Sequence, residues 1–81
     1  MKITLKAFAA VKDIINAEEL TLEVPGDTTV KSLLSILADQ YPPVEKLCDI
    51  LLIAINESYA DRDAVIQEGD TVALFPPVSG G

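Results

Sequence analysis

The sequence predicts an α+β fold in which one mixed sheet is covered on one face by a single main helix. Apolar and polar residues alternate in residues 1–9 and 19–24, a pattern typical of half-buried strands. Apolar residues recur at helical spacing in residues 30–41, and two further short apolar runs follow them. At 81 residues the chain has the length of one small domain.

The first two strands should pair antiparallel, with a short helical turn in residues 10–16 between them. The alternation places Lys2, Thr4 and Lys6 in one phase of the first strand and its aliphatic residues in the other. Phe8 falls in the lysine phase, so we expect its ring on the outer face. The residues expected to face inward in this part of the chain are Ile3, Leu5, Ala7, Val11, Ile14, Ile15, Leu20, Leu22 and Val24.

The main helix is predicted between two proline-containing breaks. Pro25-Gly26-Asp27 indicates a turn, after which Thr28 or Thr29 can cap a helix N-terminus. Pro42-Pro43 should stop the helix, because proline lacks a backbone N–H and cannot continue the hydrogen-bond ladder. The stripe expected to pack on the sheet is Val30, Leu33, Leu34, Leu37 and Tyr41.

Two more strands should follow the helix. Residues 51–55 form a continuous apolar run bounded by polar residues, which predicts a buried central strand. Asn56-Glu57 and residues 68–70 indicate turns, whereas residues 58–65 show no assignable pattern. Residues 71–75 are the last strand, with Val72 and Leu74 in its inner phase and Ala73 and Phe75 in its outer phase.

This order of elements is that of the β-grasp arrangement found in ubiquitin-like domains. We therefore divide the chain into a β-grasp domain, residues 1–75, and an extended C-terminal arm, residues 76–81. The helix should cover one face of the sheet and leave the other free. Pro76-Pro77 favours an extended arm, because proline fixes φ and donates no backbone hydrogen bond.

The arm ends in Gly80-Gly81, and we expect its working group to be a terminal carboxylate. Two glycines at the last two positions arise by chance in roughly one chain in 200. Glycine has no Cβ, so it passes through a channel too narrow for other residues and adopts backbone angles closed to them. A frayed terminus is the alternative interpretation.

The composition disfavours several classes of function. Thirteen acidic residues against six basic ones give a net charge of −7, which argues against nucleic acid or an anionic membrane and favours a partner with a basic face. The chain has no histidine and one cysteine, so we expect no metal site, no resident cofactor and no internal disulfide. Lacking a membrane span or a visible secretory leader, the chain is expected to be cytoplasmic.

Phe8 and Phe75 are candidates for a docking surface. Both fall in the outer phase of their strands, and the first and last strands of a β-grasp sheet are neighbours, so the rings could form one exposed apolar patch. The alternative is that short terminal segments turn one ring or both into the core. Cys48 could in principle carry persulfide sulfur as a thiolate, but an inert, partly buried thiol is the favoured interpretation.

The residues resemble a known family, the small sulfur-carrying subunit of molybdopterin synthase. The resemblance is most specific in residues 68–81, from Glu68-Gly69-Asp70 to the Pro-Pro-Val-Ser-Gly-Gly end. Ala54-Ile55-Asn56 and residues 8–12 are also similar, and length and element order agree over the whole chain. Lys12 stands where the family often has arginine, and lysine cannot make the bidentate contacts of arginine.

The resemblance implies a sulfur-donor subunit that is not an enzyme alone. An adenylating enzyme of the ubiquitin-activating type would use ATP and magnesium to convert the Gly81 carboxylate to an acyl-adenylate. A sulfurtransferase would then supply sulfur, giving a Gly81 thiocarboxylate. The arm would enter the large catalytic subunit of molybdopterin synthase, in a heterotetramer, and donate sulfur to cyclic pyranopterin monophosphate to form the molybdopterin dithiolene.

The implied site residues fall into two groups. Gly81, with Gly80, carries the chemistry; partner-binding residues are Phe8, Lys12, Tyr59, Phe75, Pro76, Pro77, Val78 and Ser79. The surface around Phe8, Tyr59 and Phe75 would serve the activating enzyme and the large subunit in turn. Three alternatives remain: a sulfur carrier of another pathway such as that of the thiamine thiazole, a ubiquitin-like protein modifier, and an interaction module with an idle tail.

Overall fold

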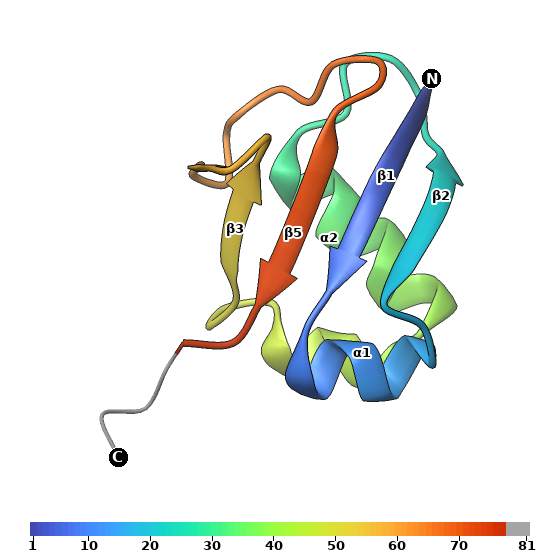
Figure 1. The fold of residues 1–81 in the computed structure, drawn as a ribbon, viewed down its shortest axis with the longest axis vertical. Coiled ribbons are helices and arrows are strands. Elements are labelled where there is room, and N and C mark those ends of the chain that lie inside the picture. Colours follow the sequence, from blue (N-terminus) through green and yellow to red (C-terminus); the bar gives the residue numbers. More distant parts are fainter. Residues whose placement is uncertain (78–81) are drawn as a thin grey trace.

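The computed structural model of the chain describes residues 1–77, which form one mixed five-stranded sheet. The main helix lies behind this sheet, and a shorter helix lies at one end of its strands (Figure 1). The strand order is β2-β1-β5-β3-β4. β1 (Lys2–Ala7) pairs antiparallel with β2 (Glu19–Glu23) and parallel with β5 (Thr71–Phe75). This mixed sheet with one main helix confirms the predicted β-grasp arrangement.

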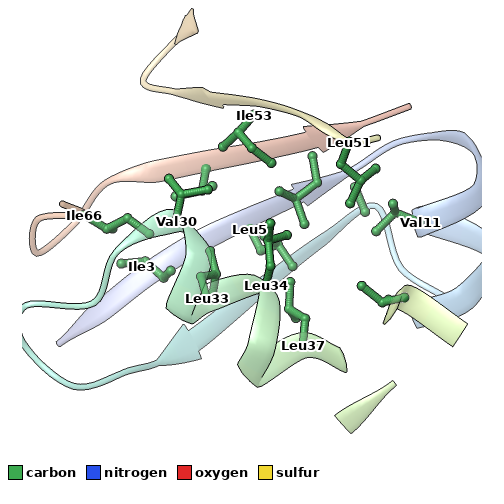
Figure 2. Packing of buried hydrophobic residues seen from close by; sticks show 14 of the residues in the cluster. Ile3, Leu5, Val11, Val30, Leu33, Leu34, Leu37, Leu51, Ile53 and Ile66 are labelled. Atoms are coloured by element: carbon green, nitrogen blue, oxygen red, sulfur yellow. The ribbon is translucent and has the colours of Figure 1, made fainter. Parts of the chain in front are cut away.

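The main helix α2 (Val30–Gln40) crosses behind the sheet in Figure 1 and supplies one wall of the core. Its N-terminus is capped by Thr29, whose hydroxyl oxygen accepts a hydrogen bond from the Ser32 N–H at 3.2 Å. Leu33 and Leu37 are fully buried, and each such side chain contributes about 1.5–3 kcal/mol to stability. Figure 2 shows them packed with Ile3 and Leu5 of β1, between helix and sheet.

Helix α2 ends before the two prolines, as predicted, but the chain after it is not an open loop. Residues Pro42–Leu47 form a 3₁₀ helix, η1, with proline in its first turn, where a missing N–H costs nothing. The turn between β1 and β2 is the helix α1 (Ala9–Ile15), in which Val11 and Ile15 are buried and Ile14 is only partly buried.

The structure confirms a strand in residues 51–55, but this strand is neither the central one nor buried on both faces. β3 (Leu52–Ile55) lies between β5 and the two-residue strand β4 (Ser58–Tyr59), and the central strand is β5. Leu52 is 38% exposed on the outer face, whereas Ile53 points into the core. The run is continuously apolar because one face contributes to the core and the other to an apolar surface.

Residues 58–65, for which the sequence shows no assignable pattern, begin with β4 and are then held by backbone contacts to the start of α2. The N–H groups of Val30 and Lys31 donate to the carbonyl oxygens of Ala64 and Arg62, each at 3.0 Å. Arg62 also reaches across the molecule: its Nη2 donates to the carbonyl oxygens of Cys48 at 2.8 Å and Leu51 at 3.0 Å. One guanidinium therefore ties this segment to the turn that leads into β3.

We expect Arg62→Met to lower the free energy of unfolding by about 1.5–3 kcal/mol, because it leaves two carbonyl groups without their charged donor. Urea unfolding followed by circular dichroism measures the change. Lys46→Met is the matched control, since it removes one cation from the exposed side of η1. Equal losses in the two variants would show that overall charge, and not the Arg62 contacts, is responsible.

Candidate functional site

Three aromatic rings form one cluster on the outer face of the sheet, and we call Phe8, Tyr59 and Phe75 the aromatic patch. Phe8 and Tyr59 are exposed, and Phe75, which pairs with both, is half-buried. The ring centroids of Phe8 and Phe75 are 6.0 Å apart at an interplanar angle of 88°. Those of Tyr59 and Phe75 are also 6.0 Å apart, at 55°. Both distances lie within the range of attractive aromatic pairs. Phe8 is 47% exposed and Tyr59 75%, so the alternative with Phe8 in the core is wrong.

The strand pairing brings these rings together from three separate parts of the chain. β1 and β5 are parallel neighbours, with Ala7 opposite Leu74, so the residues that follow, Phe8 and Phe75, are close at one end of the sheet. Phe8 keeps the outer phase of β1 because its backbone stays extended, at φ −131° and ψ 149°. Tyr59 arrives through the β3–β4 hairpin, which places it opposite Ala54.

Small side chains form the floor between the rings. Ala54 of β3 lies directly opposite Ala73 of β5, and both belong to the outer phase of their strands. Leu52 lies opposite Phe75 and extends the apolar surface along β3. Ala73 was predicted on the outer phase of β5, but Leu52 and Ala54 were missed in the sequence because the apolar run of β3 was interpreted as a buried strand.

The aromatic patch borders the start of the arm. β5 ends at Phe75, and neither Pro76 nor Pro77 continues a strand. Pro76 is half-buried and Pro77 is exposed. The predicted site residues Val78, Ser79, Gly80 and Gly81 lie outside the described residues. An exposed aromatic cluster of this kind is typical of a docking surface, and here it lies where the arm begins.

Lys12 lies on α1 close to Phe8, and its charge is already paired. Its Nζ lies 3.0 Å from the Glu18 Oε1, an ion pair in which both side chains are largely exposed. Lys12 and Phe8 line one hollow of about 450 Å³, together with Lys6 and Glu18. An exposed pair of this kind is weak, so the Lys12 ammonium can exchange Glu18 for an anionic group of a partner.

The Cys48 thiol has the character of an unreactive side chain. Burial raises the pKa of the Cys48 thiol, the nearby carboxylates of Asp49 and Glu45 raise it further, and Arg62 opposes them. The sulfur donates to the Val44 carbonyl oxygen at 3.4 Å, which also favours the protonated form. A thiol held neutral is a poor nucleophile, so the structure favours the inert interpretation of Cys48.

Another hollow lies on the helical side of the molecule, away from the aromatic patch. It measures about 600 Å³ and is bordered by α2, η1 and the segment around Arg62, with acidic and basic side chains mixed along its rim. Within residues 1–77 no group of three or more potential metal ligands is found, and no buried side-chain polar atom lacks a partner. No helix in the same range is long and apolar enough to cross a membrane.

Comparison with known proteins relates the whole chain to sulfur carriers. A family model described as the ThiS family matches residues 5–81. The molybdopterin synthase sulfur carrier subunit of Arabidopsis thaliana is 31% identical over 81 residues, covering 100% of this chain and 84% of the relative. The match therefore includes both the aromatic patch and the glycine end.

Solved structures confirm the β-grasp fold. Small archaeal modifier protein 1 of Haloferax volcanii superposes with a TM-score of 0.83 at 28% identity, over 95% of this chain and 98% of that protein. A chain in a complex of subunits 1 and 2 of molybdopterin-converting factor from Helicobacter pylori gives 0.71 at 24% identity, with 100% of both chains covered. At 24% identity, the similarity to the Helicobacter pylori chain shows a shared fold alone.

We expect the Cys48 thiol to alkylate more slowly than the same residue in the unfolded chain. Because its pKa is raised, the midpoint of the rate against pH should lie above that of the protein in urea. Iodoacetamide labelling followed by intact mass measures both profiles. In Asp49→Asn the midpoint should fall, since one repelling carboxylate is removed. A folded-state midpoint below the unfolded one would contradict this account and reopen a sulfur-carrying role for the thiol.

Proposed function

Because the chain belongs to the ThiS family, we propose that it serves as the sulfur-carrier subunit of a molybdopterin synthase. The observation that carries the proposal is the juxtaposition of an exposed aromatic patch with the start of a Gly-Gly arm. Phe8, Tyr59 and Phe75 surround the point where the chain leaves β5. The relative from Arabidopsis thaliana, matched over the whole chain, bears the name of this subunit.

The proposed chemistry begins at the Gly81 carboxylate. A free carboxylate is a poor electrophile because its oxygen is a poor leaving group. An adenylating enzyme would transfer AMP from ATP, with magnesium, to this carboxylate and release pyrophosphate. A sulfurtransferase would then supply sulfur at the oxidation level of sulfide, either as hydrosulfide or as a persulfide together with a thiol reductant. This sulfur would displace AMP and leave a thiocarboxylate. Catalytic acids and bases would come from the partner proteins, which suits a chain without histidine.

The proposed docking step uses the aromatic patch. The large catalytic subunit would cover Phe8, Tyr59 and Phe75, so that the arm enters its active site. The related fold in the Helicobacter pylori complex belongs to a subunit 1 bound to a subunit 2, which supports a partner of this kind. Aromatic side chains are common energetic centres of protein interfaces, because they bury much area with little loss of conformational entropy.

The dithiolene contains two sulfur atoms, whereas each carrier delivers one. A spent carrier must therefore leave the large subunit and be replaced, which requires a reversible interface of moderate affinity. We infer that the activating enzyme uses the same aromatic patch. The two partners would then exclude each other, and the carrier would shuttle between them.

A second candidate function is that of a protein modifier. The similarity to small archaeal modifier protein 1, at a TM-score of 0.83, favours it. In that case the activated Gly81 would form an isopeptide bond with a lysine of another protein. The two candidates differ in their product, a thiocarboxylate on the free chain or a covalent adduct on a target.

We expect the chain to gain the mass difference between sulfur and oxygen when it is incubated with a matched adenylating enzyme, ATP, magnesium and a sulfur donor. Intact mass spectrometry measures the gain. Its size should correspond to a single exchange, because only one oxygen of the Gly81 carboxylate is replaced by sulfur. A variant without Gly80 and Gly81 is the control and should show no change.

No mass gain with a matched enzyme that forms the acyl-adenylate would contradict the role as a sulfur carrier. Adducts to other proteins, formed under the same conditions and lost with Gly80 and Gly81, would transfer the proposal to a protein modifier. A gain that persists in the truncated variant would place the sulfur elsewhere on the chain.

A further inference from the structure

A further hollow continues from the aromatic patch along the outer face of β5, and we call it the β5 hollow. It measures about 360 Å³, and Thr71 and Ala73 lie on the strand that forms its floor. Phe8 borders it at one end, and the turn between β3 and β4 borders it at the other, with Glu57 on its rim. A partner that covers the aromatic patch therefore meets Glu57 at the far end of the same surface.

Glu57 occupies a backbone conformation that its residue type disfavours. The turn has two central residues, Asn56 at φ 50° and Glu57 at φ 72°, the positive angles that a type I′ turn requires. Asparagine is favoured at the first of these positions and glycine at the second, because a Cβ crowds the backbone there. A glutamate at the second position therefore weakens the hairpin relative to glycine.

The neighbouring Asn56 holds this turn in one place. Its backbone N–H donates to the Thr71 carbonyl oxygen at 2.8 Å, and its side-chain oxygen accepts from the Thr71 N–H at 3.0 Å. Its side-chain nitrogen donates to the Asp70 Oδ1 at 2.9 Å. The hairpin is thereby fixed to the start of β5, and Glu57 is presented at a defined position on the rim of the β5 hollow.

The Glu57 side chain does not offset this strain by a polar contact within residues 1–77. No ion pair or hydrogen bond of its carboxylate is found in this range, although Lys6 lines the same hollow. By contrast, the acidic side chain of Asp70 in the neighbouring turn is bonded to both Asn56 and Gln67. A strained residue without an internal role is a candidate for a functional one.

We propose that Glu57 is a specificity-determining residue that binds a lysine or arginine side chain of the large catalytic subunit. The inference rests on the proposed function, since it takes the partner to be the protein that covers the aromatic patch. The net charge of −7 favours a basic face on that partner. Lys6 lines the same hollow beside Ala73, and its charge disfavours a second cation there relative to the rim at Glu57. The charge pair would fix the register of docking relative to the arm.

The test measures binding of full-length variants to the matched large subunit by titration calorimetry at low and high salt. Glu57→Gln keeps the size of the side chain and should weaken binding about threefold to tenfold at low salt, and less at high salt. Glu57→Gly should weaken binding to a similar extent while raising the melting temperature by about 2–5 °C, because it relieves the positive φ.

Asp27→Gly is the matched control. Asp27 also has a positive φ, of 69°, and lies in the turn before α2, where it lines a separate hollow with Ser32 and Ser35. This variant removes one acidic group and one strained residue away from the β5 hollow. It should leave affinity unchanged. Phe8→Ala is the positive control for the aromatic patch itself.

The outcomes separate the inference from the proposed function. Wild-type affinity in Glu57→Gln, with weakened binding in Phe8→Ala, would overturn the role of Glu57 and leave the docking surface intact. Wild-type affinity in both would overturn the docking surface as well. Equal weakening in Asp27→Gly and Glu57→Gln would assign the effect to overall charge. A lower melting temperature in Glu57→Gly would show that Glu57 is structural, which also overturns the inference.

Discussion

The parallel pairing of β1 with β5 is the contact on which the rest of the molecule depends. It joins the first and last strands of the chain, which are neighbours inside the sheet, through the register Thr4–Thr71 to Ala7–Leu74. The inner phases of the two strands supply Ile3, Leu5, Val72 and Leu74 to the core. Their outer phases continue to Phe8 and Phe75, so the same pairing that closes the domain also assembles the aromatic patch beside the arm.

Segments with one buried and one solvated face were predictable from the sequence. The alternation in β1, β2 and β5 identifies their inner residues because only one side of each strand contacts α2. Thr29 and Pro42 mark the limits of α2 for local reasons, capping and the loss of a backbone N–H. β3 was predicted as a strand, but its outer face was wrongly taken as buried, since an apolar outer face and an apolar inner face look alike in a sequence.

The candidate site was predictable only in part. Phe8 and Phe75 could be paired because strand phase and β-grasp topology together place them on one face. The floor of Ala54 and Ala73, and the contact of Leu52 with Phe75, depend on the register between β3 and β5, which no local pattern reveals. The strain at Glu57 depends on the turn geometry, and Arg62 acts on carbonyl groups distant in sequence.

In the proposed function, the β-grasp domain provides the docking surface and the Gly-Gly arm carries the reactive carboxylate. The central claim is that the arm transfers sulfur to a pterin. A single-turnover assay tests this claim most directly. Thiocarboxylated chain is mixed with the matched large subunit and cyclic pyranopterin monophosphate. The account predicts molybdopterin formation with two carriers consumed per product, and a slower reaction for equally loaded Phe8→Ala. No product, from a large subunit that is active with another thiocarboxylated carrier, would contradict it.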